Sequence, residues 1–189
     1  MSQEIRLEGQ AGPFNLNSQR AQKEKPLSSS DGTSSISQKP ALKIEEFQVT
    51  KFKKELEFLF IDHREELTTN KDLMVLNIDW PKYEILEQNG NLLSLVAHTG
   101  REIVGYSVNI VTNNLHYSDV IVCQNDVLYL TPKFRTGYNG IKLIKETERL
   151  AKLRGCHLVL WHSKQDTNLE KLLPRLKYRT QDIIFSKEI

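Results

Sequence analysis

The sequence lacks several features that would assign it to a familiar class of protein. No apolar run approaches the ~20 residues that a membrane-spanning helix needs, so no membrane partner is expected. The first residues show no basic start followed by an apolar stretch, which is not the pattern of a secretory signal and favours a cytoplasmic protein. The formal charge of +2, from 26 Lys and Arg against 24 Asp and Glu, argues against nucleic acid as a partner, because such binding needs a basic surplus on one face.

Cysteine and histidine are also scarce. The two cysteines, Cys123 and Cys156, lie in apolar surroundings and are interpreted as small core residues in a reducing compartment. The five histidines show no His-x-x-x-His or Cys–His spacing of the kind that binds zinc, so no metal site is expected.

The composition changes near residue 42. Residues 1–42 are rich in Ser, Gln, Gly and Lys, and include SSSDGTSSIS at 28–37. Such a stretch buries too little apolar surface to offset the entropy lost on ordering. We therefore predict a flexible, disordered tail over 1–42 and a folded domain over 43–189. The tail is interpreted as a solvated linker; the alternative is a peptide that docks on a partner, with apolar anchors at 12–16 (GPFNL).

Residues 43–189 have the patterns of a mixed α/β domain. Apolar residues on one helical face predict a helix over 51–67, and His63 is expected there as a partly buried residue of that face. Pro81 is expected to open a second, short helix. The other predicted elements are strands at 44–49, 92–97, 103–111, 120–130, 157–161 and 178–185, and helices at 141–155 and 167–176, the last interrupted by Pro174.

The candidate chemistry lies where strand 120–130 turns into helix 141–155. The first turn of a helix has unpaired N–H groups and the positive end of the dipole, so it attracts anions. Gly137 and Gly140 allow close approach of a phosphate, and Arg135 adds charged donors. The segment lacks the Gly-Lys-Ser/Thr of a P-loop and the full G-x-G-x-x-G fingerprint. From the residues alone, an ordinary strand-to-helix turn remains the alternative.

The same segment, YLTPKFRTGYNGIKLIKETERLAKLRGCHLVLW, resembles motif A of the GNAT superfamily of N-acetyltransferases, Arg/Gln-x-x-Gly-x-Gly/Ala before a long helix. The ending LLPRLKYRTQDIIFSKEI resembles the last helix and final strand of that family. Three shorter pieces, at 83–90, 114–119 and 178–187, are similar to GNAT proteins encoded by tailed bacteriophages. The resemblance covers about residues 43–189 and implies a mixed, mostly antiparallel central sheet flanked by helices.

The resemblance implies an acyl-CoA-dependent N-acetyltransferase, in which an amine of a protein or small molecule attacks acetyl-CoA directly. Its pantetheine arm is expected on the backbone of Leu128, Tyr129 and Leu130. Its pyrophosphate is expected on the turn formed by Arg135, Thr136, Gly137, Tyr138, Asn139 and Gly140. This chain departs from the family pattern where Tyr138 replaces the first glycine and Leu173 stands at the position of the usual catalytic tyrosine.

Three residues are candidates for proton transfer. Asp126 lies on the strand before motif A, is expected to be desolvated among Val, Cys and Leu, and is proposed as the general base. The alternative is an aspartate that pairs with a lysine or caps a bulge. His116 and Tyr117 lie in the loop where the family's substrate channel opens and are candidate proton relays, or else plain surface residues.

A second function class stays open at this point. The chain could be a catalytically weak GNAT-fold interaction protein, carried in a phage particle or present in the host cytoplasm if phage-encoded. The tail would then be its docking element.

Overall fold

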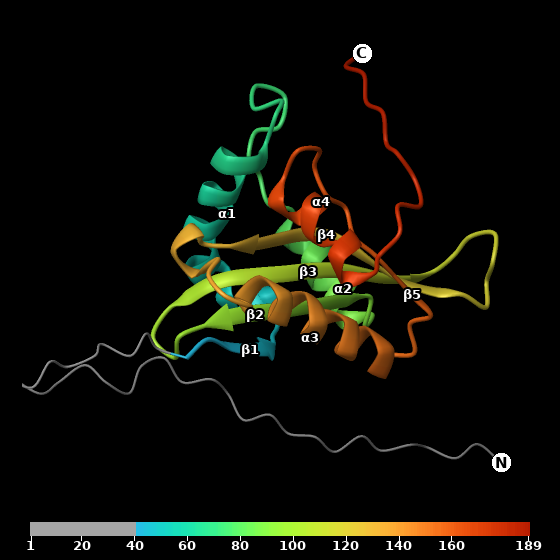
Figure 1. Ribbon diagram of the computed structural model, residues 1–189, viewed down its shortest axis with the longest axis horizontal. Coiled ribbons are helices and arrows are strands. Elements are labelled where there is room, and N and C mark those ends of the chain that lie inside the picture. The colour runs from blue at the N-terminus through green and yellow to red at the C-terminus, as the bar shows by residue number, and fades with distance from the viewer. Residues whose placement is uncertain (1–40) are drawn as a thin grey trace, which may run out of the picture. The chain divides into compact units, whose positions relative to one another are not determined.

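A five-stranded sheet in the order β1-β2-β3-β4-β5 is the frame of residues 41–189, the part of the chain that the computed structural model describes (Figure 1). Its strands are β1 (Lys43–Glu46), β2 (Leu92–His98), β3 (Ile103–Asn113), β4 (Ile121–Leu130) and β5 (Leu158–Leu160). The first four pair antiparallel and β5 joins β4 in parallel. The predicted mixed, mostly antiparallel sheet is therefore confirmed. The tail predicted for 1–42, with its anchors at 12–16, lies almost entirely outside the described residues.

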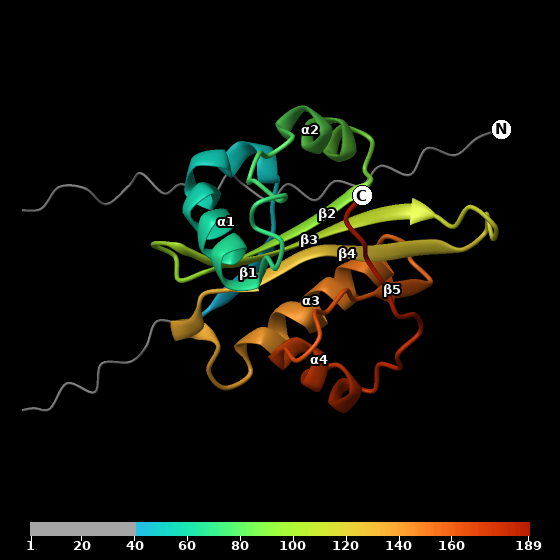
Figure 2. The same ribbon diagram turned by 90° about the horizontal axis from the view of Figure 1, so that it is seen from above.

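Helices lie on both faces of the sheet (Figure 2). One face carries α1 (Lys53–Leu67) and α2 (Trp80–Gln88), and the other carries α3 (Asn139–Leu153) and α4 (Asn168–Leu172). Three short 3-10 turns connect these elements, at Val49–Phe52, Pro132–Phe134 and Pro174–Leu176. Pro81 stands in the first turn of α2, and Pro174 separates α4 from the last turn, as the sequence predicted.

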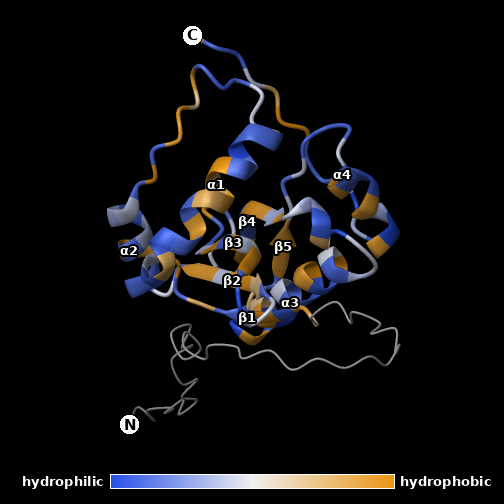
Figure 3. Ribbon diagram, turned by 90° about the vertical axis from the view of Figure 1, so that its left-hand side faces the viewer, coloured by the Kyte–Doolittle hydropathy of each residue, from blue (hydrophilic) through white to orange (hydrophobic). Residues whose placement is uncertain are grey.

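Two large apolar cores and a smaller one around Ala97, Val104 and Leu130 hold the layers together, and Figure 3 shows the apolar residues concentrated in the strands. The core under α1 and α2 contains Leu56, Leu59, Phe60, Tyr106, Val108 and Tyr129. The core under α3 contains Leu93, Leu95, Val111, Cys123, Leu143 and Ala151. The α1 residues in the first list are those that the 51–67 pattern placed on one helical face. Cys123 is buried, Cys156 is half-buried, and both are free thiols.

The last predicted strand, 178–185, is wrong. The residues after Leu176 form no helix or strand, and Lys177 leaves the turn at φ +68°. Ile183, Ile184 and Phe185 are β-rich in type, but they are exposed and pair with no strand of the described chain. Strand propensity alone does not hold a strand, because its stability comes from pairing and packing with neighbours. Strand 44–49 is also shorter than predicted, since Val49 already begins a 3-10 turn.

Within residues 41–189, no helix has the length and apolar character needed to cross a membrane.

Gly105 provides a test of the packing between β3 and β4. A Cβ at this position would lie 2.6 Å from the Tyr129 carbonyl oxygen and 2.7 Å from Leu130 Cδ1. We expect Gly105→Ala to lower the free energy of unfolding by about 1–3 kcal/mol, measured by urea denaturation. Gly140→Ala is the matched control: its Cβ meets nothing within 4 Å, and its helical position should make it neutral or stabilising by up to about 1 kcal/mol. Equal losses in the two variants would contradict this account.

Candidate functional site

Strands β4 and β5 run together over only part of their length. β5 pairs with residues 122–124 of β4 and then ends at Leu160. β4 continues to Leu130 with β3 on one edge and, among residues 41–189, no strand on the other. The second half of β4 therefore offers an unpaired backbone edge.

A β-bulge lies where the two strands part. Val108 of β3 faces Val127, while its neighbour Asn109 faces Asn125, so that no residue of β3 lies opposite Asp126 in the register. An extra residue of this kind bends a strand and increases its twist. The bulge thus accounts for the direction in which the end of β4 leaves β5.

The Asn125 side chain holds the bulge from inside. Its Nδ2 lies 3.3 Å from the Val108 carbonyl, 3.1 Å from the Val127 carbonyl and 3.0 Å from Asn109 Oδ1. Asn125 is 1 % exposed, and a buried amide is stable only when it is hydrogen-bonded. The other members of this buried polar chain, which reaches α3, are Asn109, Ser107 and Thr147.

The free edge of β4 presents backbone groups of Leu128 and Leu130. The Tyr129 carbonyl lies against Gly105 of β3, and successive residues of a strand point their backbone groups to opposite edges. The Leu130 carbonyl on the free edge accepts a hydrogen bond of 2.5 Å from Arg135 Nε. The N–H and C=O of Leu128 have no strand partner on that edge within the described chain.

The turn into α3 carries a set of backbone donors without acceptors. Gly137 lies at φ +58°, a conformation that favours glycine, and nothing lies within 4 Å of a Cβ at Gly137 or Gly140. Among the described residues, no acceptor is found for the N–H groups of Thr136, Gly137, Tyr138, Gly140 and Ile141. These donors stand at the N-terminus of a 15-residue helix, where the dipole is positive. The turn therefore has the geometry of an anion site, and Tyr138, 73 % exposed, does not fill it.

Arg135 has partners other than the anion that the sequence suggested. Its Nη1 and Nη2 lie 2.5 and 2.6 Å from the two carboxylate oxygens of Glu66, near the end of α1. Its guanidinium also lies over the Tyr129 ring, 5.3 Å from the ring centre. The hydrogen bond from Arg135 lowers the pKa of Glu66 and keeps that carboxylate charged.

His63, one turn earlier on α1, faces the same strands. Its Nδ1 lies 2.6 Å from the Tyr106 hydroxyl, and its ring stacks on Tyr129 with centres 5.1 Å apart. Burial lowers the pKa of His63 to about 4 and raises the pKa of Tyr106 well above its usual range, so both groups are neutral at pH 7. The sequence placed His63 on the buried face, but nothing in it indicated these aromatic partners.

Asp126 lies at the bulge and is exposed, so the expected desolvation of its carboxylate is wrong. The extra residue turns it away from the packed interior. Its carboxylate is close enough to Tyr83 of α2 to add to the rise in the pKa of that tyrosine to about 12, which burial mainly causes. Asp126 therefore lies on the side of the sheet that α1 and α2 cover.

His116 and Tyr117 are exposed in the loop between β3 and β4, at the other end of β4 from the turn into α3 (Figure 1). β4 has ten residues, which corresponds to about 30 Å. The Asn114 side chain accepts hydrogen bonds from the backbone N–H groups of His116 and Tyr117, which is an ordinary turn arrangement. The structure does not bring these two residues to the rest of the candidate site, and their predicted proton relay is not retained.

Leu173, at the position of the usual family tyrosine, is buried and has no polar atom in its side chain to offer. Among residues 41–189, no group of three or more His, Cys, Asp or Glu is placed to hold a metal ion.

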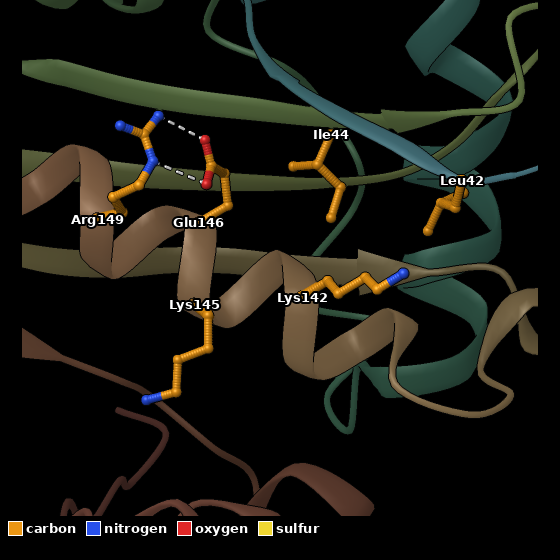
Figure 4. Close-up of a pocket in the computed structure, with 6 residues that line it drawn as sticks. All are labelled: Leu42, Ile44, Lys142, Lys145, Glu146 and Arg149. Carbon is orange, nitrogen blue, oxygen red and sulfur yellow. Dashed lines mark hydrogen bonds and ion pairs between the residues drawn. The ribbon is translucent and has the colours of Figure 1, made fainter.

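A surface hollow between β1 and α3 is separate from these residues (Figure 4). It is lined by Leu42, Ile44, Lys142, Lys145, Glu146 and Arg149. Arg149 and Glu146 pair along the helix at 2.7 Å, and Lys145 points away from the β1 side chains. None of the predicted site residues lines this hollow.

No family model matches the sequence, and no curated protein matches it. Solved structures share its fold. They include an aminoglycoside acetyltransferase from an uncultured soil metagenomic sample (14 % identity, TM-score 0.64, covering 79 % of this chain and 99 % of that one). They also include a ribosomal-protein-alanine N-acetyltransferase from Brucella melitensis biovar Abortus 2308 (15 %, TM-score 0.62, 79 % and 99 %). A third is glucosamine-6-phosphate N-acetyltransferase from Arabidopsis thaliana (16 %, TM-score 0.59, 78 % and 98 %). The described chain has the GNAT fold. At these identities the likeness is one of fold, and the similarity to phage proteins stays a prediction.

The burial of neutral His63 makes stability depend on pH. The unfolded chain protonates this imidazole near pH 6.5 and the folded chain only near pH 4. The contribution of the neutral His63 side chain to the free energy of unfolding is therefore complete above pH 6.5. It is lost as the pH falls from 6.5 to about 4, because the unfolded chain then binds a proton that the folded chain does not. Allowing for partial exposure, we expect a loss on the order of 2 kcal/mol in the free energy of unfolding.

The measurement is urea denaturation of the wild type and His63→Gln between pH 7 and pH 4. The difference in the free energy of unfolding between the wild type and His63→Gln should shrink as the pH falls from 7 to 4. His162→Gln, which removes an exposed histidine, should follow the wild-type profile. Parallel profiles for wild type and His63→Gln would contradict the prediction.

Proposed function

We propose that this chain is an acyl-CoA-dependent N-acetyltransferase that moves an acetyl group from acetyl-CoA to an amine of a protein or a small molecule. The observation that carries the proposal is the junction of an unpaired strand edge with a turn full of free N–H groups. Thioester cofactors of the CoA type need both features, one for the amides of the pantetheine arm and one for the pyrophosphate. The acetyltransferase names of the structures with the same fold support acetyl transfer in general.

The residues present fit acetyl-CoA. The backbone of Leu128 on the free edge of β4 can pair with a pantetheine amide, and the side chains of Tyr129 and Leu130 are buried on opposite faces of the sheet. The N–H groups of the 136–140 turn can hold the pyrophosphate, with open space beside Gly137 and Gly140. Both features lie on consecutive segments of the chain.

Acetyl-CoA would supply a thioester carbonyl that an amine attacks, so that a C–N bond forms and the C–S bond breaks. The attacking amine must lose a proton, and the Asp126 carboxylate is the acid–base group at the bulge that can accept it, directly or through water. Leu173 cannot donate a proton to the departing sulfur, so the thiolate leaves without help from that position and is protonated by solvent.

One alternative is kept, a GNAT-fold interaction protein without strong catalysis, present in the host cytoplasm or carried in a phage particle. It is favoured by the apolar residues Ile183, Ile184 and Phe185, which are exposed on a segment that forms no strand. This alternative requires no acetyl-CoA binding, and so the same titration tests both functions.

Gly140 tests the cofactor site. We expect the full chain to bind acetyl-CoA with a micromolar Kd in calorimetric titration. Gly140→Glu should weaken binding at least about tenfold, because it adds a side chain and a negative charge beside the free N–H groups. Gly140→Gln adds the same bulk without the charge and should lose less affinity for acetyl-CoA than Gly140→Glu. If the wild type fails to bind at about 1 mM acetyl-CoA, a Kd weaker than about 1 mM, the enzyme proposal is overturned and the interaction protein is favoured.

Asp126 tests the reaction. With an amine acceptor found by screening for release of free CoA, Asp126→Asn should lower kcat by about 10²–10⁴-fold, because a positioned base contributes that much. Its Kd for acetyl-CoA should not change. Asp119→Asn, in the loop between β3 and β4, is the control and should retain wild-type kcat. Full activity in Asp126→Asn would remove Asp126 from the mechanism.

A further inference from the structure

Arg135 and Glu66 join two parts of the chain that the proposed reaction uses for different purposes. Arg135 opens the turn that would hold the pyrophosphate, whereas Glu66 lies in the last turn of α1, which covers the opposite face of the sheet from α3. The two residues are 69 positions apart in sequence. Their contact is therefore a tertiary link across the end of β4.

All three nitrogens of the Arg135 guanidinium are already bonded within the described chain. Nε donates to the Leu130 carbonyl at 2.5 Å, and the two Nη atoms donate to the two carboxylate oxygens of Glu66. The Tyr129 ring lies against the guanidinium plane. A paired fork of this kind fixes orientation as well as distance. Arg135, at the start of the turn, thus links the end of the free strand edge to the Glu66 carboxylate.

His63 supports the same arrangement from one turn earlier on α1. Residues three apart on a helix are neighbours on its surface, so His63 and Glu66 face the same strands together. His63 contacts Tyr106 and Tyr129, and the Tyr129 ring also contacts the Arg135 guanidinium. The end of α1 is therefore fixed to β3 and β4 at more than one point.

We propose that Glu66 is a positioning residue for the cofactor site, and that Arg135 acts through it as a strut rather than as a ligand of the phosphates. The pair would set the direction in which the free N–H groups between Thr136 and Ile141, those of all residues there except Asn139, face relative to the Leu128 edge. This inference rests on the proposed function, because the site that it positions is the one for acetyl-CoA.

The sign of one substitution separates a strut from a charged ligand. CoA is a polyanion, so removal of the Glu66 charge makes the site more positive and frees the Arg135 fork. If Arg135 attracts or binds the phosphates directly, Glu66→Gln should tighten binding or leave it unchanged. If Glu66 positions the turn, the same change should weaken binding despite the favourable charge.

The experiment uses the full chain with Glu66→Gln, Arg135→Gln, both together, and the exchanged pair Glu66→Arg with Arg135→Glu. We expect each single change to raise the Kd and the KM for acetyl-CoA about tenfold. The double change should be no worse than either single one, because they remove one link. The exchanged pair should recover most of the affinity, which a charged ligand at 135 could not do. Glu65→Gln, whose carboxylate pairs with Arg64 and Lys71, should leave the Kd unchanged.

Wild-type or tighter binding by Glu66→Gln would overturn the inference while leaving the proposed function intact. If the wild type itself binds no acetyl-CoA, the proposed function fails, and the strut is tested by hydrogen–deuterium exchange over residues 131–142. Faster amide exchange there in Glu66→Gln than in Glu65→Gln would still support a strut. Identical exchange would overturn it.

Discussion

The candidate site depends on one extra residue in β4. Alternate residues of a strand point to opposite faces, so inserting Asp126 reverses the faces for everything that follows. Before the bulge Cys123 packs under α3, and after it Tyr129 packs under α1 while Leu130 belongs to the other face. Without the bulge the Tyr129 ring would point toward α3. The stacking of His63 and the approach of Arg135 therefore both follow from this single offset.

The bulge is itself held by polar groups that have no access to water. Asn125 supplies the donors that the offset carbonyls need, and its neighbours continue the chain of hydrogen bonds to Thr147 in α3. In a low-dielectric interior each missing partner would leave a costly unsatisfied group, so the network favours one arrangement of strand and helix. The helix that presents the anion site and the strand that presents the free edge are thus fixed relative to each other.

The sequence predicted the features that depend on local pattern. The apolar face of 51–67, the alternating strands and the glycine turn before α3 all follow from spacing that is visible in the chain. A bulge at Asp126 was only the alternative interpretation of this residue, because Asp126 continues the alternation with Gln124 and the offset shows only against β3. Nor could spacing reveal that Arg135 pairs with Glu66, 69 residues away. The strand expected at 178–185 failed for the converse reason: its residue types are suitable, but no strand in the described part of the chain pairs with it.

Two of the cations nearest the turn are already paired with carboxylates, so the backbone has a large share in attracting an anion. Arg135 is already neutralised by Glu66, and Lys133 lies 3.3 Å from Glu102. His63 adds no charge, because burial keeps it neutral and the neighbouring Arg135 and Lys164 oppose its protonation. Apart from Lys142 in the first turn of α3, the attraction comes from the α3 dipole and the unpaired N–H groups, whose strength depends on their direction. A site built in this way is sensitive to the orientation of its backbone, and for that reason a carboxylate that never touches the anion can still control it.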